Sequence, residues 1–364
     1  MTQLLDKPLT PAKAASKAAA QLKPFRVHAF GAGIQSMALL EAWAFDSIIM
    51  RKDTVEGQLW DGFFPEGPPD ICMFGDTQSE PPHVYRSVEF AKTICEEAGV
   101  PFETVTIGNL AYPPKSKNGT QQIFTPLYTV CVEGHYETTY EPVHLLDRYR
   151  LEQLLAMADE GILEGAELDE FNAMPKTEKK VWIEPGAHGR LRRQCTGRYK
   201  IDPVMKRAKE LAGDRPIEIW LGVSIDEAHR MKSDPSDMVR YFYPLIFNQK
   251  SSGFAPMNRN DCKIFLKQID WTAGKSACWF CPFHSDAVWG QMKKQQPELF
   301  ALACDYDERM RHARPGYECF VHRQRIPLRD VYFYDADPKV LDLGLFQGQD
   351  MSETGGCDDG YCGL

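Results

Sequence analysis

The sequence predicts an α/β fold in which a parallel sheet carries helices on both faces, and three observations predict it. Short apolar segments of strand length alternate with segments of helical periodicity in the N-terminal part of the chain. The first predicted strand, Phe25–Phe30, runs through a glycine-containing turn at 31–33 into a helix that is apolar on most sides. A further apolar strand is expected at 217–223. Strands that alternate with helices are typical of a parallel sheet.

Length and composition agree with a folded α/β protein. The chain has 364 residues, enough for one large or two ordinary domains, and 43% of them are hydrophobic, enough for a sizeable core. No apolar run reaches the roughly eighteen residues that a membrane span needs, so no membrane contact is expected. Residues 1–24 lack the apolar core of a signal peptide and are expected to form a mobile polar arm. A cytoplasmic location is therefore expected.

Two more strands and one helix follow the first unit. A short apolar strand is expected at 71–74, and it ends in Gly75, Asp76 and Thr77. Residues at the carboxyl ends of parallel strands face the ligand crevice, so Asp76 and Thr77 are placed to meet a nucleotide; alternatively they cap a turn. The next helix is expected to start at the adjacent prolines near 81 and to end at Gly99, before a strand at 102–107.

The middle of the chain is less regular. Segment 111–141 is rich in turn residues and aromatic residues and is expected to be a loop or lid. Helices are expected at 145–157 and at 203–211, the second capped by Asp202. A later helix is expected to start at Ser285.

The turn at 31–33 has the geometry of a phosphate site. Its glycines let the backbone turn sharply, and its N–H groups lie at the start of a helix, where the helix dipole attracts anions. A tight strand-to-helix turn without a ligand is the alternative. A dinucleotide site of the GxGxxG type is disfavoured, because Ser36 stands where the third glycine is needed, and Asp53 lies in a loop rather than at a strand end.

The charge pattern argues against a broad nucleic-acid surface but leaves room for a local one. The net charge is -9. The segment 189–200 nevertheless holds five cations and no acid, and segment 311–325 is also basic. Either segment can be a solvated face, or it can bind an anion.

The cysteines favour a metal site over disulfides. There are 11 of them, scattered along a chain without a secretion signal. Cys278 and Cys281 form a CxxC pair that follows a turn, as in a metal-binding knuckle. Cys195 and Cys262 lie in basic or mixed-charge surroundings that favour the thiolate, and they are expected to complete a four-cysteine site. Separate buried thiols are the alternative. Cys304 and Cys319 are rival ligands, and Cys304 is expected to be a core residue.

Four stretches together carry a resemblance to a known family. They are the loop 31–36, Asp76 with Thr77 after the second strand, the run Cys-Thr-x-x-Tyr-Lys-x-x-Pro at 195–203, and the run Ser-Ala-Cys-x-Phe-Cys-Pro at 276–282. The chain resembles the PAPS reductase-like branch of the PP-loop ATP pyrophosphatase superfamily over residues 25–310. It is most similar to phage- and island-encoded members and to DNA phosphorothioation sulfurtransferases.

The match has departures. In the family loop Ser-Gly-Gly-x-Asp-Ser, Gly31 stands for the first serine, Ala32 for the first glycine and Gln35 for the acid. Gln194 replaces the first cysteine of the cysteine pair found in sulfonucleotide reductases, and the resemblance leaves Cys262 to supply the missing ligand.

The resemblance implies a domain organisation and a set of ligands. Residues 25–250 are expected to form the PP-loop nucleotide-binding domain, and the cysteine-rich region 251–364 is expected to complete the metal site. The expected ligands are ATP or another adenine nucleotide, a magnesium ion, and a [4Fe–4S] cluster or, alternatively, zinc. The residues expected to bind the nucleotide are Phe30, Gly31, Ala32, Gly33, Gln35, Ser36, Asp76, Thr77, Gly222 and Lys200.

The resemblance also implies a reaction. The segment 221–230 is similar to the family segment that meets the nucleotide phosphates, so Arg230 is expected to neutralise them. The C-terminal end is similar to the Glu-Cys-Gly-Leu-His tail of the reductases, which makes Cys362 a candidate nucleophile. The expected function is iron–sulfur-dependent sulfur transfer by adenylation of a nucleic-acid or nucleobase acceptor. A partner protein is a further expected binding partner. The alternatives are a sulfonucleotide reductase and a non-catalytic nucleotide-binding regulator.

Overall fold

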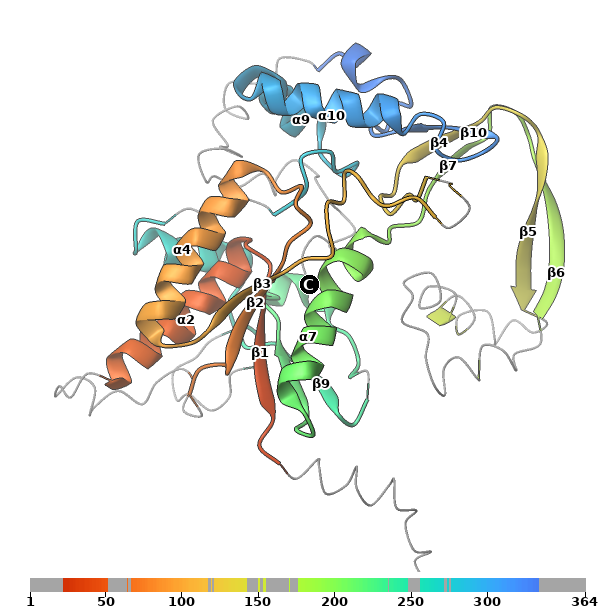
Figure 1. Cartoon of the computed structure of the whole chain (residues 1–364). Coiled ribbons are helices and arrows are strands. Elements are labelled where there is room, and N and C mark those ends of the chain that lie inside the picture. The colour runs from red at the N-terminus through yellow and green to blue at the C-terminus, as the bar shows by residue number, and fades with distance from the viewer. Residues whose placement is uncertain are drawn as a thin grey trace, which may run out of the picture.

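The centre of the protein is a five-stranded parallel sheet (Figure 1). The computed structural model describes residues 22–51, 64, 67–116, 119, 121–142, 150, 153, 154, 170, 176–234, 236–247, 256–271, 274 and 276–333. The strand order is β3-β2-β1-β8-β9, and every neighbouring pair runs parallel. The strands are β1 (Phe25–Phe30), β2 (Ile71–Gly75), β3 (Phe102–Val105), β8 (Ile217–Trp220) and β9 (Val239–Phe242).

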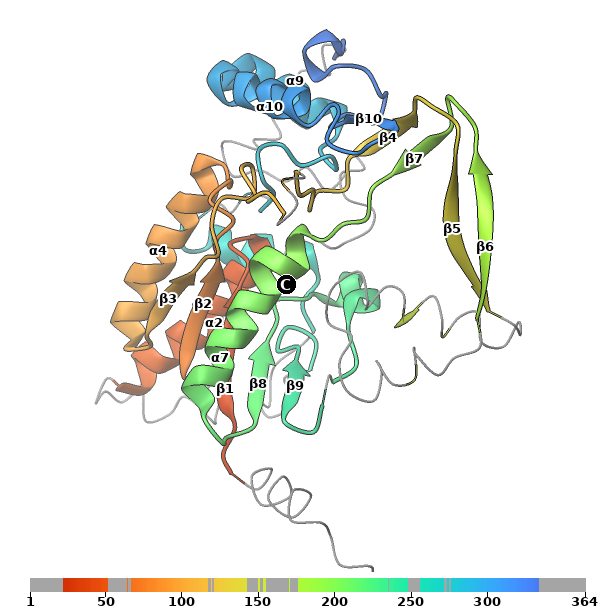
Figure 2. The ribbon, with the colours of Figure 1, turned by 45° about the vertical axis from the view of Figure 1, so that its right-hand side comes forward.

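Helices cover both faces of this sheet, as predicted (Figure 2). On one face α2 packs against α4 and α8, and on the other face α7 lies across the strands. Because both faces are covered, all six residues of β1 are buried, and the strand reads as a continuous apolar run apart from two polar residues. None of the described helices has the length and apolar composition to cross a bilayer. The helices are α2 (Ile34–Arg51), α4 (Pro82–Ala98), α7 (Asp202–Ala212) and α8 (Arg259–Lys267).

The predicted helix ends are confirmed in one case and wrong in another. Gly99 adopts a left-handed conformation with φ of 64° and ends α4, as expected. Asp202 does not cap α7: the π-helix Gly197–Ile201 continues directly into α7, and Asp202 lies in the first turn. The predicted helix 145–157 lies outside the described residues except for positions 150, 153 and 154, and so does the predicted arm 1–24 except for residues 22–24.

A second layer lies beyond the carboxyl ends of the parallel strands. It contains a three-stranded antiparallel sheet in the order β10-β4-β7 and two helices, and it has its own hydrophobic cluster. The segment 111–141, expected to be a loop or lid, contributes β4 to this sheet. The sheet therefore takes strands from both sides of residue 250, where a domain boundary was predicted. Its elements are β4 (Tyr128–Cys131), β7 (His188–Arg190), β10 (Tyr317–Phe320), α9 (Asp286–Gln295) and α10 (Pro297–Arg309).

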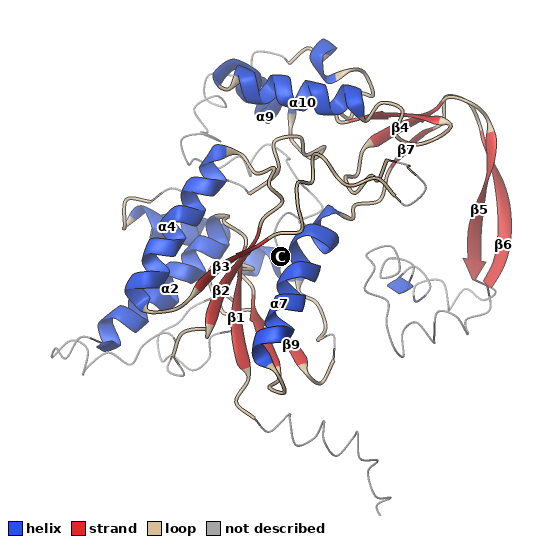
Figure 3. Ribbon diagram, viewed as in Figure 1, coloured by secondary structure: helices blue, strands red, loops and turns tan. Residues whose placement is uncertain are grey.

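A two-stranded antiparallel ribbon projects from this layer (Figure 3). It consists of β5 (His135–Pro142) and β6 (Lys176–Ile183), which pair along their whole length. Two short 3₁₀ segments complete the described secondary structure, η2 (Ile225–Arg230) and η3 (Leu328–Asp330).

One buried carboxylate holds the C-terminal part of the second layer together. Asp307 in α10 accepts hydrogen bonds from the backbone N–H of Val321 at 2.6 Å and of Leu328 at 3.0 Å. It also accepts a hydrogen bond from the guanidinium of Arg311. A carboxylate that loses its hydration is stable in a core only when such donors replace the water.

We expect the variant Asp307→Asn to lose about 2–4 kcal/mol of unfolding free energy, because the amide group removes the ion pair and leaves a buried donor in place of an acceptor. Urea unfolding measures the loss. Asp305→Asn on the exposed side of the same helix is the matched control and should stay within about 0.5 kcal/mol of the parent protein. Equal stability of the two variants would contradict the role of Asp307.

Candidate functional site

The candidate site lies where the order of the strands reverses, between β1 and β8. From β1 the chain leaves to α2 on one face, whereas β8, the neighbour of β1, is reached from α7 on the other face. Ligands of open α/β sheets bind outside the strand ends at such a point. The segments after β1 and β8 touch there, since a Cβ on Gly222 would lie 2.7 Å from the backbone N and Cα of Ser36. Only glycine allows this approach.

The turn after β1 leaves open space at Gly33. Ala32 adopts a left-handed conformation with φ of 55°, which aims the following peptide into the turn. Among the described residues, a Cβ on Gly33 would meet only the backbone N of Ser276, at 4.0 Å. The helix α2 begins at Ile34, and its first turn holds no acidic side chain that would neutralise the positive end of the helix dipole. These features favour the binding of an anion at the turn.

A buried histidine, His28, holds the side chain of Ser36 behind the turn by a hydrogen bond. The indole Nε1–H of Trp43 donates to His28 Nδ1 at 3.0 Å, so the ring proton lies on Nε2, which donates to Ser36 Oγ at 3.2 Å. The backbone N–H of Gly31 also donates to Ser36 Oγ, at 2.9 Å. Complete burial lowers the pKa of His28 to about 3 and keeps the ring neutral. Sequence reasoning missed His28; a histidine in an apolar strand directly before a glycine turn was the available signal.

Arg230 reaches the same region through an acidic partner. Glu227 Oε2 accepts hydrogen bonds from Arg230 at 2.6 Å and from the Gln35 side-chain amide at 3.0 Å. Gln35 Nε2 also lies 3.4 Å from Ser224 Oγ, across the switch point. Gln35 stands where the family loop has an acid. Its side-chain hydrogen bonds therefore link α2 to η2. Sequence reasoning placed Arg230 here but not Glu227.

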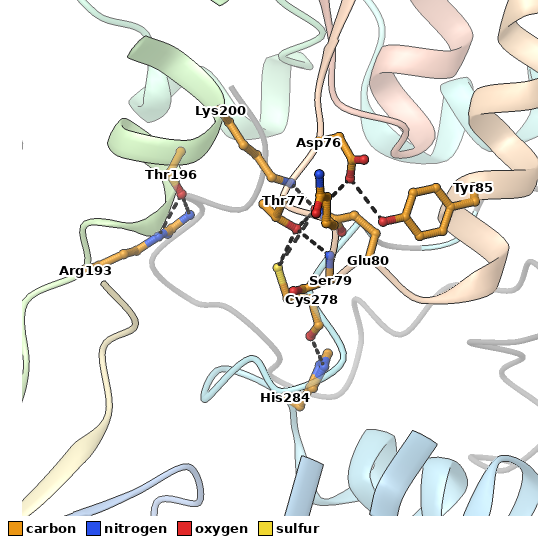
Figure 4. A network of polar contacts seen from close by, with 11 residues as sticks. Asp76, Thr77, Ser79, Glu80, Tyr85, Arg193, Thr196, Lys200, Cys278 and His284 are labelled. Carbon is orange, nitrogen blue, oxygen red and sulfur yellow. Dashed lines mark hydrogen bonds and ion pairs between the residues drawn. The ribbon is translucent and has the colours of Figure 1, made fainter. Parts of the chain in front are cut away.

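Three of the four predicted metal-ligating cysteines line one cavity. Cys195, Cys278 and Cys281 surround a space of about 30 Å³, room for about two water molecules, together with Thr77 and Lys200. The Cys278 thiol lies 3.4 Å from the Thr77 hydroxyl (Figure 4). Burial raises the pKa of Cys278 well above the usual range of a thiol.

A buried ion pair lies beside the Cys278 thiol. Lys200 Nζ lies 2.8 Å from Glu80 Oε1, and the Glu80 side chain is fully buried. The same oxygen accepts a hydrogen bond from the Thr77 hydroxyl at 3.1 Å and lies 3.9 Å from Cys278 Sγ. Glu80 Oε2 is buried and has no hydrogen-bond partner among the described residues. Asp76, at the end of β2, accepts hydrogen bonds from Tyr85 at 3.0 Å and from a backbone N–H in its own turn.

The structure does not bring Cys262 to this cavity. Cys262 lies on α8 and is fully buried in the hydrophobic cluster around α2, where burial raises its pKa to about 12. Cys195 and Cys278 pack against the separate cluster of the second layer. The predicted fourth ligand is therefore not at this site, because α8 uses Cys262 to fill space between helices. Cys304 is a buried residue of α10, as predicted, and Cys362 lies outside the described residues.

The three thiols do not form a metal cage in this structure. Over the described part of the chain, no group of three or more Cys, His, Asp or Glu side chains is arranged to hold a metal ion. For the predicted cluster or zinc ion, the described part of the chain therefore supplies three thiols that face one small cavity and no fourth cysteine. What the structure does bring together is the turn and the thiols, since Ser276 lies next to Gly33 and also lines the thiol cavity.

Comparison of the chain with protein-family models, with curated proteins and with solved structures found no match.

We expect the stability of the protein to fall as the pH drops below about 6.5, because His28 stays neutral in the folded state while the unfolded chain binds a proton. At pH 5 this difference amounts to about 2 kcal/mol. In His28→Gln the amide can replace both hydrogen bonds without titrating, so urea unfolding should depend less on pH between 7.5 and 5. The exposed substitution His312→Gln is the control, and an unchanged slope in His28→Gln would overturn the assignment.

Any metal that copurifies with the protein is expected to persist in Cys262→Ser and to be lost from Cys278→Ser. The reason is that Cys262 lies in a different hydrophobic cluster from the three cavity thiols. Elemental analysis of anaerobically purified protein measures the metal content. Cys262→Ser should instead lower the melting temperature, since it buries a hydroxyl in an apolar environment. If Cys262→Ser lost its metal while its stability stayed unchanged, Cys262 would be a metal ligand after all.

Proposed function

We propose that the chain is a PP-loop enzyme of the PAPS reductase-like family that binds an adenine nucleotide at the turn after β1 and transfers sulfur to a nucleic-acid or nucleobase acceptor. One observation carries the proposal: the open glycine turn at the switch point adjoins a cavity lined by three thiols, with Ser276 between them. A phosphate site alone is common, and buried thiols alone are common, but their proximity, with one residue between them, favours chemistry on a nucleotide with sulfur.

The turn supplies the phosphate site of the proposal. Backbone N–H groups at the start of α2 bind the phosphates, and the helix dipole favours their negative charge. The hydroxyl of Ser36 is fixed by two donors, the His28 ring and the Gly31 N–H, so its own hydrogen is left to point toward a phosphate oxygen. A magnesium ion would accompany the triphosphate.

The reaction has two steps in this proposal. An oxygen of the acceptor attacks the α-phosphorus of ATP, the bond to the β-phosphate breaks, and pyrophosphate leaves. A sulfur nucleophile then attacks the activated carbon or phosphorus of the acceptor, and AMP leaves with the oxygen. The cations Lys200 and Arg230 stabilise the charge that develops on the leaving groups.

The thiol cavity is the sulfur-handling part of the proposal. Cys278 lies beside the Glu80–Lys200 pair, so charged groups able to hold or move a proton lie within reach of its sulfur. An iron–sulfur cluster or a zinc ion stays a prediction from the sequence, and neither step of the reaction depends on it.

We expect Gly33→Ala to weaken ATP binding at least tenfold, about 1.4 kcal/mol, because the added methyl group fills the space through which a phosphate approaches the turn. The fold should tolerate it, since the nearest atom of the described residues lies 4.0 Å from the new Cβ. In the matched variant Gly222→Ala the Cβ would lie 2.7 Å from backbone atoms, so it should lower stability by about 1–3 kcal/mol.

Titration calorimetry with ATP and thermal unfolding separate these effects, and release of AMP and pyrophosphate with single-stranded DNA or RNA tests turnover. ATP binding by Gly33→Ala that equals the parent protein would refute the phosphate site. Nucleotide binding without AMP release from any acceptor would leave a nucleotide-binding protein and remove the proposed reaction.

A further inference from the structure

One segment of this acidic protein is strongly basic. Residues 176–200 hold eight lysines and arginines against two glutamates, whereas the whole chain has a net charge of -9. The segment begins in β6 of the projecting ribbon, passes through β7 and ends at Lys200 in the thiol cavity. The chain therefore connects the ribbon to the candidate site (Figure 2), with lysines at 176–180 and with arginines and Lys200 at 190–200.

The ribbon carries an open pair of aromatic side chains. Tyr136 on β5 lies directly opposite Trp182 on β6, with ring centroids 5.0 Å apart. Their exposed fractions are 66% and 43%, which is high for large aromatic side chains. The Trp182 ring lies against Gly134, where a Cβ would come within 2.3 Å of it. The pair is thus held in place but keeps ring surface in solvent.

The face of the ribbon that carries this pair also holds an exposed lysine, Lys180, and, two positions farther along β6, Glu178. Side chains alternate along a strand, so Thr138 and Lys180 follow on the same face as Tyr136 and Trp182, and both are exposed. Glu137 belongs to the opposite face. Its carboxylate accepts hydrogen bonds from the Tyr317 hydroxyl and from the Arg314 guanidinium, each at 2.6 Å. This acid is therefore neutralised within the protein.

Arginines continue the basic surface from the ribbon to the thiol cavity. The guanidinium groups of Arg190 and Arg193 lie over the ring of Phe283, at 5.2 and 5.8 Å from its centroid. Arg193 and Phe283 line the same cavity as the three thiols, and Arg190 and Arg192 are exposed. Aromatic and cationic groups thus reach the cavity that the proposed reaction uses.

We propose that this surface binds a single-stranded nucleic acid, with bases stacked on Tyr136 and Trp182 and with phosphates along Lys180, Arg190 and Arg192. Stacking on aromatic side chains together with a basic track is how single strands are held without a sequence requirement. A duplex hides its base faces and offers phosphates alone. The proposal deepens the proposed function, because it names the acceptor as a single strand that reaches the thiol cavity along this path.

The aromatic pair also has a structural role that the test has to separate from binding. A ribbon of two strands is marginally stable in water, and cross-strand aromatic pairs stabilise it. Loss of binding after removal of either ring would therefore be ambiguous. Exposed cations are better targets, because their replacement on a surface usually changes stability by less than about 0.5 kcal/mol.

The test compares two double variants that remove the same charge. Lys180→Gln with Arg192→Gln acts on the proposed track, and Lys209→Gln with Lys267→Gln removes two exposed lysines elsewhere. Fluorescence anisotropy with a labelled oligothymidylate of about twenty nucleotides measures affinity between about 50 and 200 mM salt. We expect the track variant to bind about tenfold or more weakly at low salt, with a salt slope shallower by about 1.4, and the control to bind like the parent protein.

A second readout reports stacking. Binding of the same oligothymidylate should quench tryptophan fluorescence in the parent protein, and Trp182→Phe, which keeps an aromatic pair, should lose most of that quenching. A duplex of equal length that binds as tightly as the single strand would overturn the proposal, and so would equal affinity of the two double variants.

ATP affinity measured on the same preparations separates this proposal from the proposed function. Normal ATP binding without oligothymidylate binding would refute the nucleic-acid surface alone. Oligothymidylate binding without ATP binding would refute the nucleotide site and keep the surface.

Discussion

The candidate site depends on one constraint, the close approach of two backbones between β1 and β8, where the strand order reverses. Gly222 after β8 lies against the first turn of α2, and any side chain there would collide with backbone atoms of Ser36. This contact fixes where α2 begins relative to β8, and hence where its N–H groups point. The hydrogen bond from Gln35 to Glu227 is a second link between α2 and the segment after β8. A site for charged groups needs such fixed geometry, because dipoles that must reorient lose much of their effect.

The second layer turns this strand edge into an enclosed site. Its antiparallel sheet and two helices enclose a cluster of aromatic and aliphatic residues, against which Cys195 and Cys278 pack. A buried ion pair between Glu80 and Lys200 lies beside the resulting cavity, which Lys200 lines. Buried ion pairs contribute little to stability when compared with apolar residues of similar size. In the proposed function, this pair next to a thiol serves proton transfer rather than stability.

Charge is distributed in a way that fits the proposed acceptor. The protein as a whole is acidic and would repel a nucleic acid from most of its surface, whereas the segment 176–200 is basic. Repulsion elsewhere and attraction along one path orient a polyanion even when no base is read. On this view the ribbon, which projects from the body of the protein in Figures 1 and 2, extends the path beyond the cavity.

The sequence alone determined the parallel α/β core, the turn after β1 and the end of α4 at Gly99, because periodicity and glycine conformation are local properties. It also identified Cys195, Cys278 and Cys281, which the fold does gather. It could not exclude Cys262, since a thiol ligand and a thiol that fills space between two helices have the same local sequence. The partners of Cys278, above all Glu80 and Lys200, and the position of His28 beneath Ser36 depend on contacts between distant segments. Only the tertiary structure decides such contacts, because packing rather than local propensity selects them.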